Sequence, residues 1–226
     1  MCEKCRDSGF VLVVKNGYEV AVRCDCYEKN MSLLRLKNSG ISEEFQKKGF
    51  KEFECNGIAS LQEAKEMAIK YYQDFLTNEI GRQNSIIFCG QPGSGKSHLG
   101  MAICNNLLNV CHVGVAYMAY RNAITRIKQM IMDKENYYTE LNTYCNARLL
   151  YIDDLFKGKP TEADLNIIYE LVNFRYMNNK PMIISTEKLQ EELVDIDEAI
   201  GSRILEMCRG NIVKMQGKEL NYRLYS

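Results

Sequence analysis

Two short, mainly apolar runs near the N-terminus predict a β-hairpin. Phe10-Val-Leu-Val-Val14 and Tyr18-Glu-Val-Ala-Val22 flank Lys15-Asn16-Gly17. Asn-Gly between two such runs is a strong hairpin signal, because the tight turns that join antiparallel strands need residues that accept positive φ. The hairpin would bring the residues before and after it together at its open end.

From residue 60 onward, apolar runs of strand length alternate with segments of helical periodicity. This alternation is typical of an α/β fold in which helices flank a parallel sheet. Ser60, with Glu63 three residues later, and Thr161 are the expected N-caps of two of the helices. The predicted strands cover residues 85–89, 113–118, 148–154, 180–187, 212–215 and 219–224. The predicted helices cover residues 60–75, 96–104, 121–133, 135–145, 161–179, 189–193 and 196–208.

Composition and charge narrow the functional class. A chain of 226 residues can hold one substantial core and a small appendage. Because 29 Lys and Arg balance 29 Asp and Glu, no global basic field favours nucleic acid. Any DNA contact would come from local groups such as Arg121, Arg126 and Lys128, or Lys157 and Lys159, which could equally be solvated faces. No apolar run approaches the roughly 20 residues that cross a bilayer, and no signal-peptide pattern is present, so we expect a cytoplasmic protein without a membrane partner.

The clearest chemical signal is Gly90-Gln-Pro-Gly-Ser-Gly-Lys96-Ser97, which fits G-x-x-x-x-G-K-[ST] between a predicted strand and a predicted helix. Its glycines let backbone N–H groups surround an anion, and the helix directs its positive end at that anion. Lys96 would bridge the β- and γ-phosphates, and the Ser97 hydroxyl would ligate Mg²⁺. A chance glycine turn rarely stands between a strand and a helix. The expected nucleotide contacts are Gly90, Gly93, Ser94, Gly95, Lys96, Ser97 and His98.

Two acids end the predicted strand at residues 148–154. Asp153 would hold the Mg²⁺ hydration shell, directly or through Ser97. Asp154 stands where a carboxylate could polarise an attacking water. The polar residues Ser185, Thr186 and Glu187 end another predicted strand, where ligands of parallel sheets bind. They could sense a γ-phosphate, with Thr186 in contact with the nucleotide, or they could cap the helix at 189–193.

Four of the ten cysteines lie within the first 26 residues. The hairpin would bring Cys2 and Cys5 close to Cys24 and Cys26, and four thiolates suit one tetrahedral Zn²⁺ of structural type. The alternatives are four unligated thiols or a redox pair. Such a small segment has little core of its own, so the metal would supply its folding energy. We therefore divide the chain into a zinc-binding ribbon (1–28), a helical connector (29–59) and a nucleotide-binding domain (60–226). The helical fragments expected around the connector cover residues 27–36 and 42–48.

These motifs together resemble the helicase-loader ATPases of the DnaC/DnaI type, AAA+ proteins close to the replication initiator DnaA and the transposition helper IstB. The resemblance rests on three segments, Gly90 to Leu99, Leu150-Tyr-Ile-Asp-Asp-Leu155 and Ile200-Gly-Ser-Arg-Ile204. The N-terminal cysteines also look like the zinc module of Gram-positive and phage loaders. The match spans nearly the whole chain.

The resemblance implies an ATPase with Lys96, Asp153, Asp154 and Arg203 as catalytic residues, Arg203 reaching the γ-phosphate of a neighbouring subunit. Taken alone, Arg203 on a helix is more often a surface ion-pair partner. Arg223 is a candidate second nucleotide-sensing arginine. Thr186-Glu187 replaces the family's usual sensor asparagine, and the C-terminal helical lid of many AAA+ proteins is not expected here.

The implied cofactors are ATP, Mg²⁺ and Zn²⁺. The implied partners are a DnaB-type replicative helicase, single-stranded DNA and further copies of the chain, assembled in an ATP-dependent oligomer. Two alternatives stay open. One is an IstB-like helper that would recruit a transposase, and the other is an adaptor that binds ATP without hydrolysing it.

Overall fold

Five parallel strands form the centre of the protein in a computed structural model, which describes residues 2–27, 30–31, 34, 47–77, 81–111 and 113–225. The sheet order is β4-β5-β6-β3-β7, so β6 separates β3 from β5. The expected parallel sheet is thereby confirmed. The strands are β3 (Ile86–Gly90), β4 (Val115–Ala119), β5 (Leu149–Leu155), β6 (Met182–Thr186) and β7 (Ile212–Met215).

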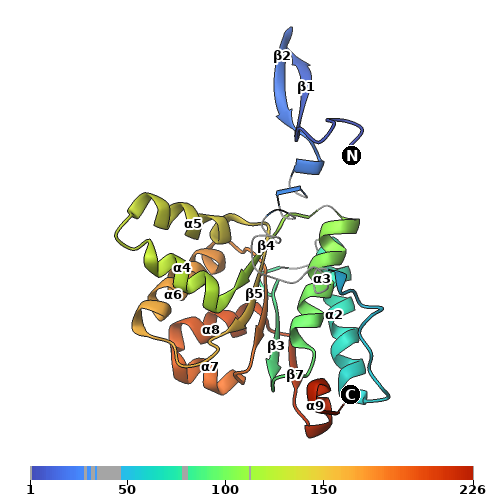
Figure 1. Ribbon diagram of the computed structural model, residues 1–226, viewed down its shortest axis with the longest axis vertical. Coiled ribbons are helices and arrows are strands. Elements are labelled where there is room, and N and C mark those ends of the chain that lie inside the picture. Colours follow the sequence, from blue (N-terminus) through green and yellow to red (C-terminus); the bar gives the residue numbers. More distant parts are fainter. Residues whose placement is uncertain are drawn as a thin grey trace.

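Helices cover both faces of this sheet, as Figure 1 shows. One face carries α2 (Ala59–Thr77) and α3 (Lys96–Val110), whose apolar residues join one core cluster. Five helices pack on the other face in a second cluster. Because both faces are covered, β3 and β6 are buried along their whole length, which explains their uninterrupted apolar sequences. The five helices are α4 (Tyr120–Gln129), α5 (Lys134–Asn146), α6 (Glu162–Met177), α7 (Gln190–Ile196) and α8 (Glu198–Met207).

The N-terminal hairpin forms as predicted and stands apart from the sheet in Figure 1. β1 (Phe10–Lys15) pairs antiparallel with β2 (Tyr18–Arg23). Asn16 and Gly17 both have positive φ, 52° and 82°, as the tight turn requires. The hairpin leaves apolar side chains in solvent: Leu12 is 67% exposed and Val14 71%.

The C-terminal tail differs from the prediction. β7 is present, but the prediction of a strand at residues 219–224 is wrong. The short helices η2 (Lys218–Leu220) and α9 (Tyr222–Tyr225) occupy this segment instead. The chain turns at Gly217, where φ is 153°, and the Tyr222 N–H then donates to Gly93 O at 3.1 Å. The tail therefore folds over the phosphate loop instead of joining the sheet.

Other boundaries shift by a few residues. Thr161 caps α6 as expected, with its hydroxyl accepting from the Asp164 N–H. α4 ends at Gln129 rather than at residue 133, because Asp133 instead caps α5 and accepts from the Asn136 N–H. α2 begins at Ala59, one residue before the expected cap Ser60. Most of the helical fragments expected at 27–36 and 42–48 lie outside the described residues. Among the described helices, none combines the length and apolarity needed to span a membrane.

Candidate nucleotide site and cysteine cluster

The loop between β3 and α3 is packed so closely that a side chain at Gly90 or Gly95 would force its neighbours to move. A Cβ on Gly90, whose φ is 136°, would lie 2.2 Å from Met215 O of the neighbouring strand. Gly95 has a φ of 94°, and a Cβ there would lie 2.6 Å from the ring of Phe53. The loop therefore curls back tightly before α3 begins at Lys96, with the first backbone amides of the helix beside it.

Lys96 is almost fully buried inside this loop. Its Nζ donates to Gln91 O at 2.6 Å, and Ser94 Oγ donates to the same carbonyl at 2.9 Å. Burial lowers the pKa of Lys96, and the nearby carboxylates of Asp154 and Glu187 oppose that shift. An ammonium group held among backbone dipoles and acids is suited to bind phosphate oxygens.

Ser97 and Asp153 meet at the end of the sheet. Ser97 Oγ donates to Asp153 Oδ1 at 2.7 Å, which joins the start of α3 to the C-terminal end of β5 across β6. A hydroxyl and a carboxylate are oxygen ligands of the kind that Mg²⁺ prefers. This donor set fits the ion that the sequence predicts, through Ser97 and Asp153.

Asp154 turns into the same crevice. Its φ of 58° is unusual for a residue other than glycine, and its backbone N–H donates to Ser185 Oγ at 3.0 Å. Its carboxylate pairs with Lys157 Nζ at 2.7 Å, and Lys157 also lies 3.4 Å from Glu187. The carboxylate pair raises the pKa of Lys157, with the Asp154 hydrogen bond as the main cause.

The three polar residues at the C-terminal end of β6, Ser185, Thr186 and Glu187, lie in different surroundings. Ser185 is buried and donates to Asp153. Thr186 is also buried; its hydroxyl donates to Leu155 O at 2.7 Å and accepts from the Lys188 N–H at 3.1 Å, before α7 begins. Only Glu187 of these three is among the residues that line the cavity.

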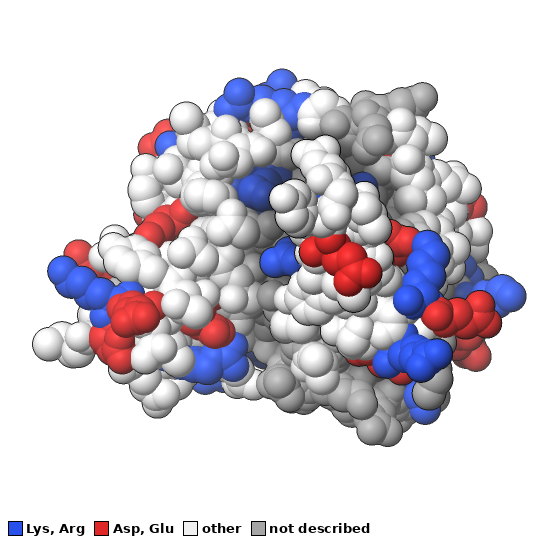
Figure 2. Space-filling model, turned by 90° about the horizontal axis from the view of Figure 1, so that it is seen from above, with Lys and Arg blue, Asp and Glu red and all other residues white. Residues whose placement is uncertain are grey.

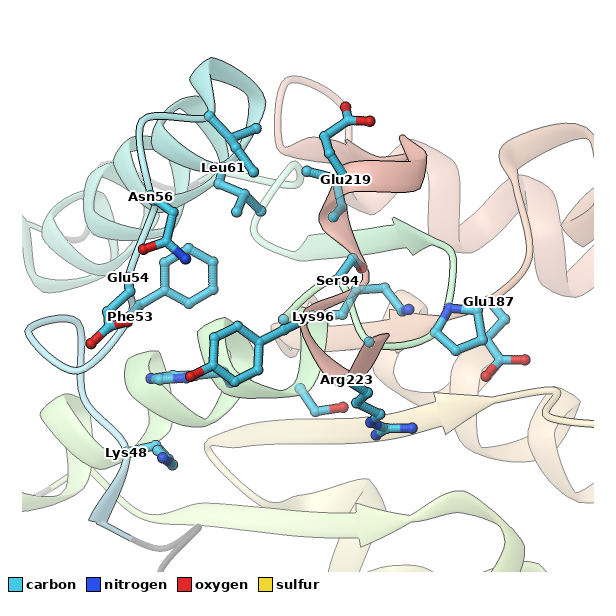
Figure 3. Close-up of a pocket in the computed structure, with 18 of the residues that line it drawn as sticks. Lys48, Phe53, Glu54, Asn56, Leu61, Ser94, Lys96, Glu187, Glu219 and Arg223 are labelled. Carbon is cyan, nitrogen blue, oxygen red and sulfur yellow. The ribbon is translucent and has the colours of Figure 1, made fainter. Parts of the chain in front are cut away.

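A cavity of about 560 Å³ opens above the phosphate loop, a size that is typical of small-molecule sites. The loop, Asp154, Lys157 and Glu187 line one end. Figure 3 shows Phe53 and Leu61 on one side and Glu219 and Arg223 of the C-terminal tail on another. Arg223 therefore lies where a cis contact with a bound nucleotide is feasible.

Residues 48–58, which were expected to belong to a connector, form a wall of the cavity. His98 Nε2 lies 3.0 Å from Gly49 O, and the His98 and Phe53 rings meet edge to face at 5.2 Å. Asn105 Nδ2 donates to Lys48 O at 2.8 Å, and Lys65 Nζ donates to Phe53 O at 2.9 Å. Burial lowers the pKa of His98, so its ring is mainly neutral near pH 7. No local sequence pattern in residues 48–58 indicated this wall, which depends on the buried Phe53.

Arg203 does not line this cavity. It lies on α8, where its Nε donates to Asn173 Oδ1 at 3.1 Å and its Nη1 donates to Ala199 O at 2.7 Å. The rings of Tyr169 and Tyr176 flank the guanidinium at 5.4 and 5.5 Å. The side chain is thus held in a defined position outside the cavity of its own chain.

Most of the basic residues considered for DNA are engaged within the chain. Arg126 pairs with Glu140, Lys128 pairs with Asp164 at 2.7 Å, and Lys157 lies in the cavity. On the face that Figure 2 draws, basic and acidic side chains are interspersed.

The four N-terminal cysteines gather into one cluster. Their Sγ atoms all lie within 4.8 Å of one another, with Cys2 and Cys24 at 3.7 Å and Cys5 and Cys26 at 3.2 Å. Four thiolates about 2.3 Å from one tetrahedral ion would be about 3.8 Å apart. The spacing therefore fits a single zinc ion without a free ligand position.

The sheet order, the phosphate loop and the Ser97–Asp153 pair define a P-loop nucleotide-binding protein of the α/β class. Residues 55–209 match the family described as the bacterial DnaA ATPase domain. The chain is 40% identical to the phage-like element PBSX protein XkdC of Bacillus subtilis, over 99% of this chain and 86% of that one. It is 28% identical to the replicative helicase loader DnaC of Escherichia coli, over 84% of this chain and 76% of that one.

Solved structures share the fold. The replication initiator DnaA bound to AMPPCP and single-stranded DNA superposes with a TM-score of 0.62 at 20% identity, covering 77% of this chain and 51% of that one. The chain belongs to the AAA+ family of the bacterial DnaA ATPase domain, as a member of its DnaC/DnaI helicase-loader type.

Proposed function

We propose that this protein is an ATP-dependent loader of a replicative helicase onto single-stranded DNA. The observation that carries the proposal is the joining of Lys96, Ser97 and Asp153 at one end of the sheet in a chain of the helicase-loader type. The likeness to DnaC supports a helicase as the partner. The DnaA structure with single-stranded DNA supports that nucleic acid as the second ligand.

In this proposal the cavity holds ATP. The loop amides and Lys96 bind the phosphates, with Gly93, Ser94, Gly95 and His98 of the cavity lining around them and Gly90 at the start of the loop. Ser97 and Asp153 would hold Mg²⁺, and the bound ion would neutralise negative charge on the phosphates. Asp154 accepts a proton from the attacking water once Lys157 leaves it, and Thr186 acts indirectly by holding the end of β5.

Arg203 completes the site of a neighbouring copy in this proposal. Its place outside the cavity and its fixed contacts on α8 suit a guanidinium that is presented to another subunit. Hydrolysis would then depend on assembly, and a single copy would bind ATP but turn it over slowly.

We assign helicase binding to residues 1–28, with Zn²⁺ on the four cysteines, and nucleotide binding to residues 60–226 together with the wall at 48–58. A hairpin of two strands has too little core to be stable alone, so metal ligation is needed to fix it. Its exposed Leu12 and Val14 offer an apolar docking surface.

Capture of a purified hexameric replicative helicase tests the partner. The double variant Leu12→Ser/Val14→Ser should weaken capture by at least about tenfold, because each apolar side chain buried in an interface contributes about 1–3 kcal/mol. Met132→Ser is the matched control, since Met132 is 95% exposed in the turn before α5. Capture of a transposase in place of the helicase would contradict the loader assignment and favour the helper.

Metal removal tests the ribbon separately. Elemental analysis should find about one zinc per chain, and Cys5→Ser should lose it and expose the hairpin to protease, because a structural zinc site supplies the folding energy of its module. Cys111→Ser, which lies outside both the cluster and the cavity, should keep the metal. Nucleotide affinity should be unchanged in both variants. A protease-resistant hairpin in the metal-free protein would contradict the structural role of the zinc.

A further inference from the structure

The carboxylate of Asp153 accepts hydrogen bonds from the hydroxyl groups of four side chains. Ser97 and Tyr151 donate to Oδ1 at 2.7 and 2.8 Å, and Ser185 donates to the same oxygen. Tyr117 donates to Oδ2 at 2.8 Å. Because donors reach both oxygens from different strands, the carboxylate can rotate about its χ2 only by breaking hydrogen bonds.

Strand register brings the two phenols to this carboxylate. Tyr117 in β4 is the parallel partner of Tyr151 in β5, and Tyr151 precedes Asp153 by two residues. Alternate residues of a strand point to the same face, so all three side chains lie under α3. The two rings meet edge to face, with centroids 5.3 Å apart and planes at 71°.

Gly100 of helix α3 leaves space for the ring of Tyr151. A Cβ on Gly100 would lie 2.7 Å from the Tyr151 hydroxyl and 2.6 Å from its Cζ. The same hydroxyl lies 3.4 Å from Ser97 O. Gly100 therefore lets the phenol of Tyr151 reach between Ser97 and Asp153, one turn after the phosphate loop.

Packing alone does not explain two tyrosines at these positions. Phenylalanine would fill the same volume and would bring no polar group that needs a partner in the interior. Both hydroxyl groups end on the one carboxylate that faces Ser97.

We propose that Tyr117 and Tyr151 are positioning residues that hold Asp153 in the orientation required by the divalent cation of the nucleotide site. This inference rests on the proposed function. The phenols act through Asp153 and do not touch the nucleotide. Without the Tyr117 hydroxyl, Oδ2 loses its described donor, the carboxylate samples other rotamers, and the cation-dependent part of nucleotide affinity falls.

Calorimetry with AMPPCP, in excess MgCl₂ and again in EDTA, tests this proposal. In the wild type, Mg²⁺ should tighten binding. In Tyr117→Phe the tightening should be smaller by about tenfold, the lower end of what one hydrogen bond to a charged group contributes, and the affinity in EDTA should be unchanged. Tyr138→Phe, an exposed tyrosine of α5, is the matched control and should behave as the wild type.

The outcomes separate the two proposals. An equal Mg²⁺ effect in wild type and Tyr117→Phe would overturn the positioning role, and so would an equal loss of affinity with and without Mg²⁺, which indicates a structural role only. A wild type that binds no AMPPCP would overturn the proposed function and this inference with it. The ratio of the two affinities is measured on the same folded protein, so a lower melting temperature of the variant does not obscure it.

Discussion

Replacing Arg203 with alanine should slow ATP hydrolysis by about 10³- to 10⁵-fold and leave ATP binding nearly unchanged. Arginines that stabilise the transition state of phosphoryl transfer from a neighbouring subunit contribute rate factors of that size. Because Arg203 lies outside the cavity of its own chain, its removal takes no contact away from the nucleotide bound there. Phosphate release at saturating ATP, beside calorimetric affinity, measures the two quantities separately.

Two further variants sharpen this result. Arg203→Lys keeps the charge but loses the planar fork that Asn173 and the Ala199 carbonyl hold, so most of the rate should still be lost. Arg209→Ala removes an exposed guanidinium just beyond the end of α8 and should hydrolyse ATP as the wild type does. Equal rates in all four proteins would eliminate Arg203 as a catalytic residue. If those rates are also no higher than the rate of Lys96→Ala, they would favour an adaptor that binds ATP without hydrolysis.

The sequence predicted the sheet and the phosphate loop because both depend on local patterns. The strands of a sheet covered on both faces are continuous apolar runs, and β3 and β6 are of this kind. Gly90 and Lys96 belong to a motif whose spacing is fixed by the loop itself. The Asn16-Gly17 turn likewise specified the hairpin.

What could not be predicted depends on contacts between distant segments. The tail was expected to add a strand at 219–224, but its residues bind the phosphate loop through Tyr222 and Gly217 instead. The wall formed by residues 48–58 depends on Phe53 packing against Gly95. Neither the sequence of the connector nor the phosphate-loop motif indicates this contact. Tyr117 and Tyr151 resemble ordinary strand residues until the register places both on Asp153.

Replacing Lys96 with alanine should weaken ATP binding by about 30- to 1,000-fold, because the loss of a buried ammonium removes one or two charge-assisted hydrogen bonds to phosphate. Calorimetry measures this change. Lys70→Ala, which removes an exposed ammonium on α2, is the control for the altered net charge and should bind as the wild type does.

The Lys96 variant also tests whether Arg203 acts between subunits. Lys96→Ala retains Arg203 but binds ATP poorly, whereas Arg203→Ala binds ATP but lacks the guanidinium. If Arg203 reaches a neighbouring site, a mixture of the two inactive proteins should hydrolyse ATP, because some Arg203→Ala subunits will receive the arginine of a Lys96→Ala neighbour. A mixture as inactive as its components, under conditions where the two variants co-assemble, would place the action of Arg203 within its own chain. The fixed contacts of Arg203 on α8, away from the cavity, lead us to expect the active mixture.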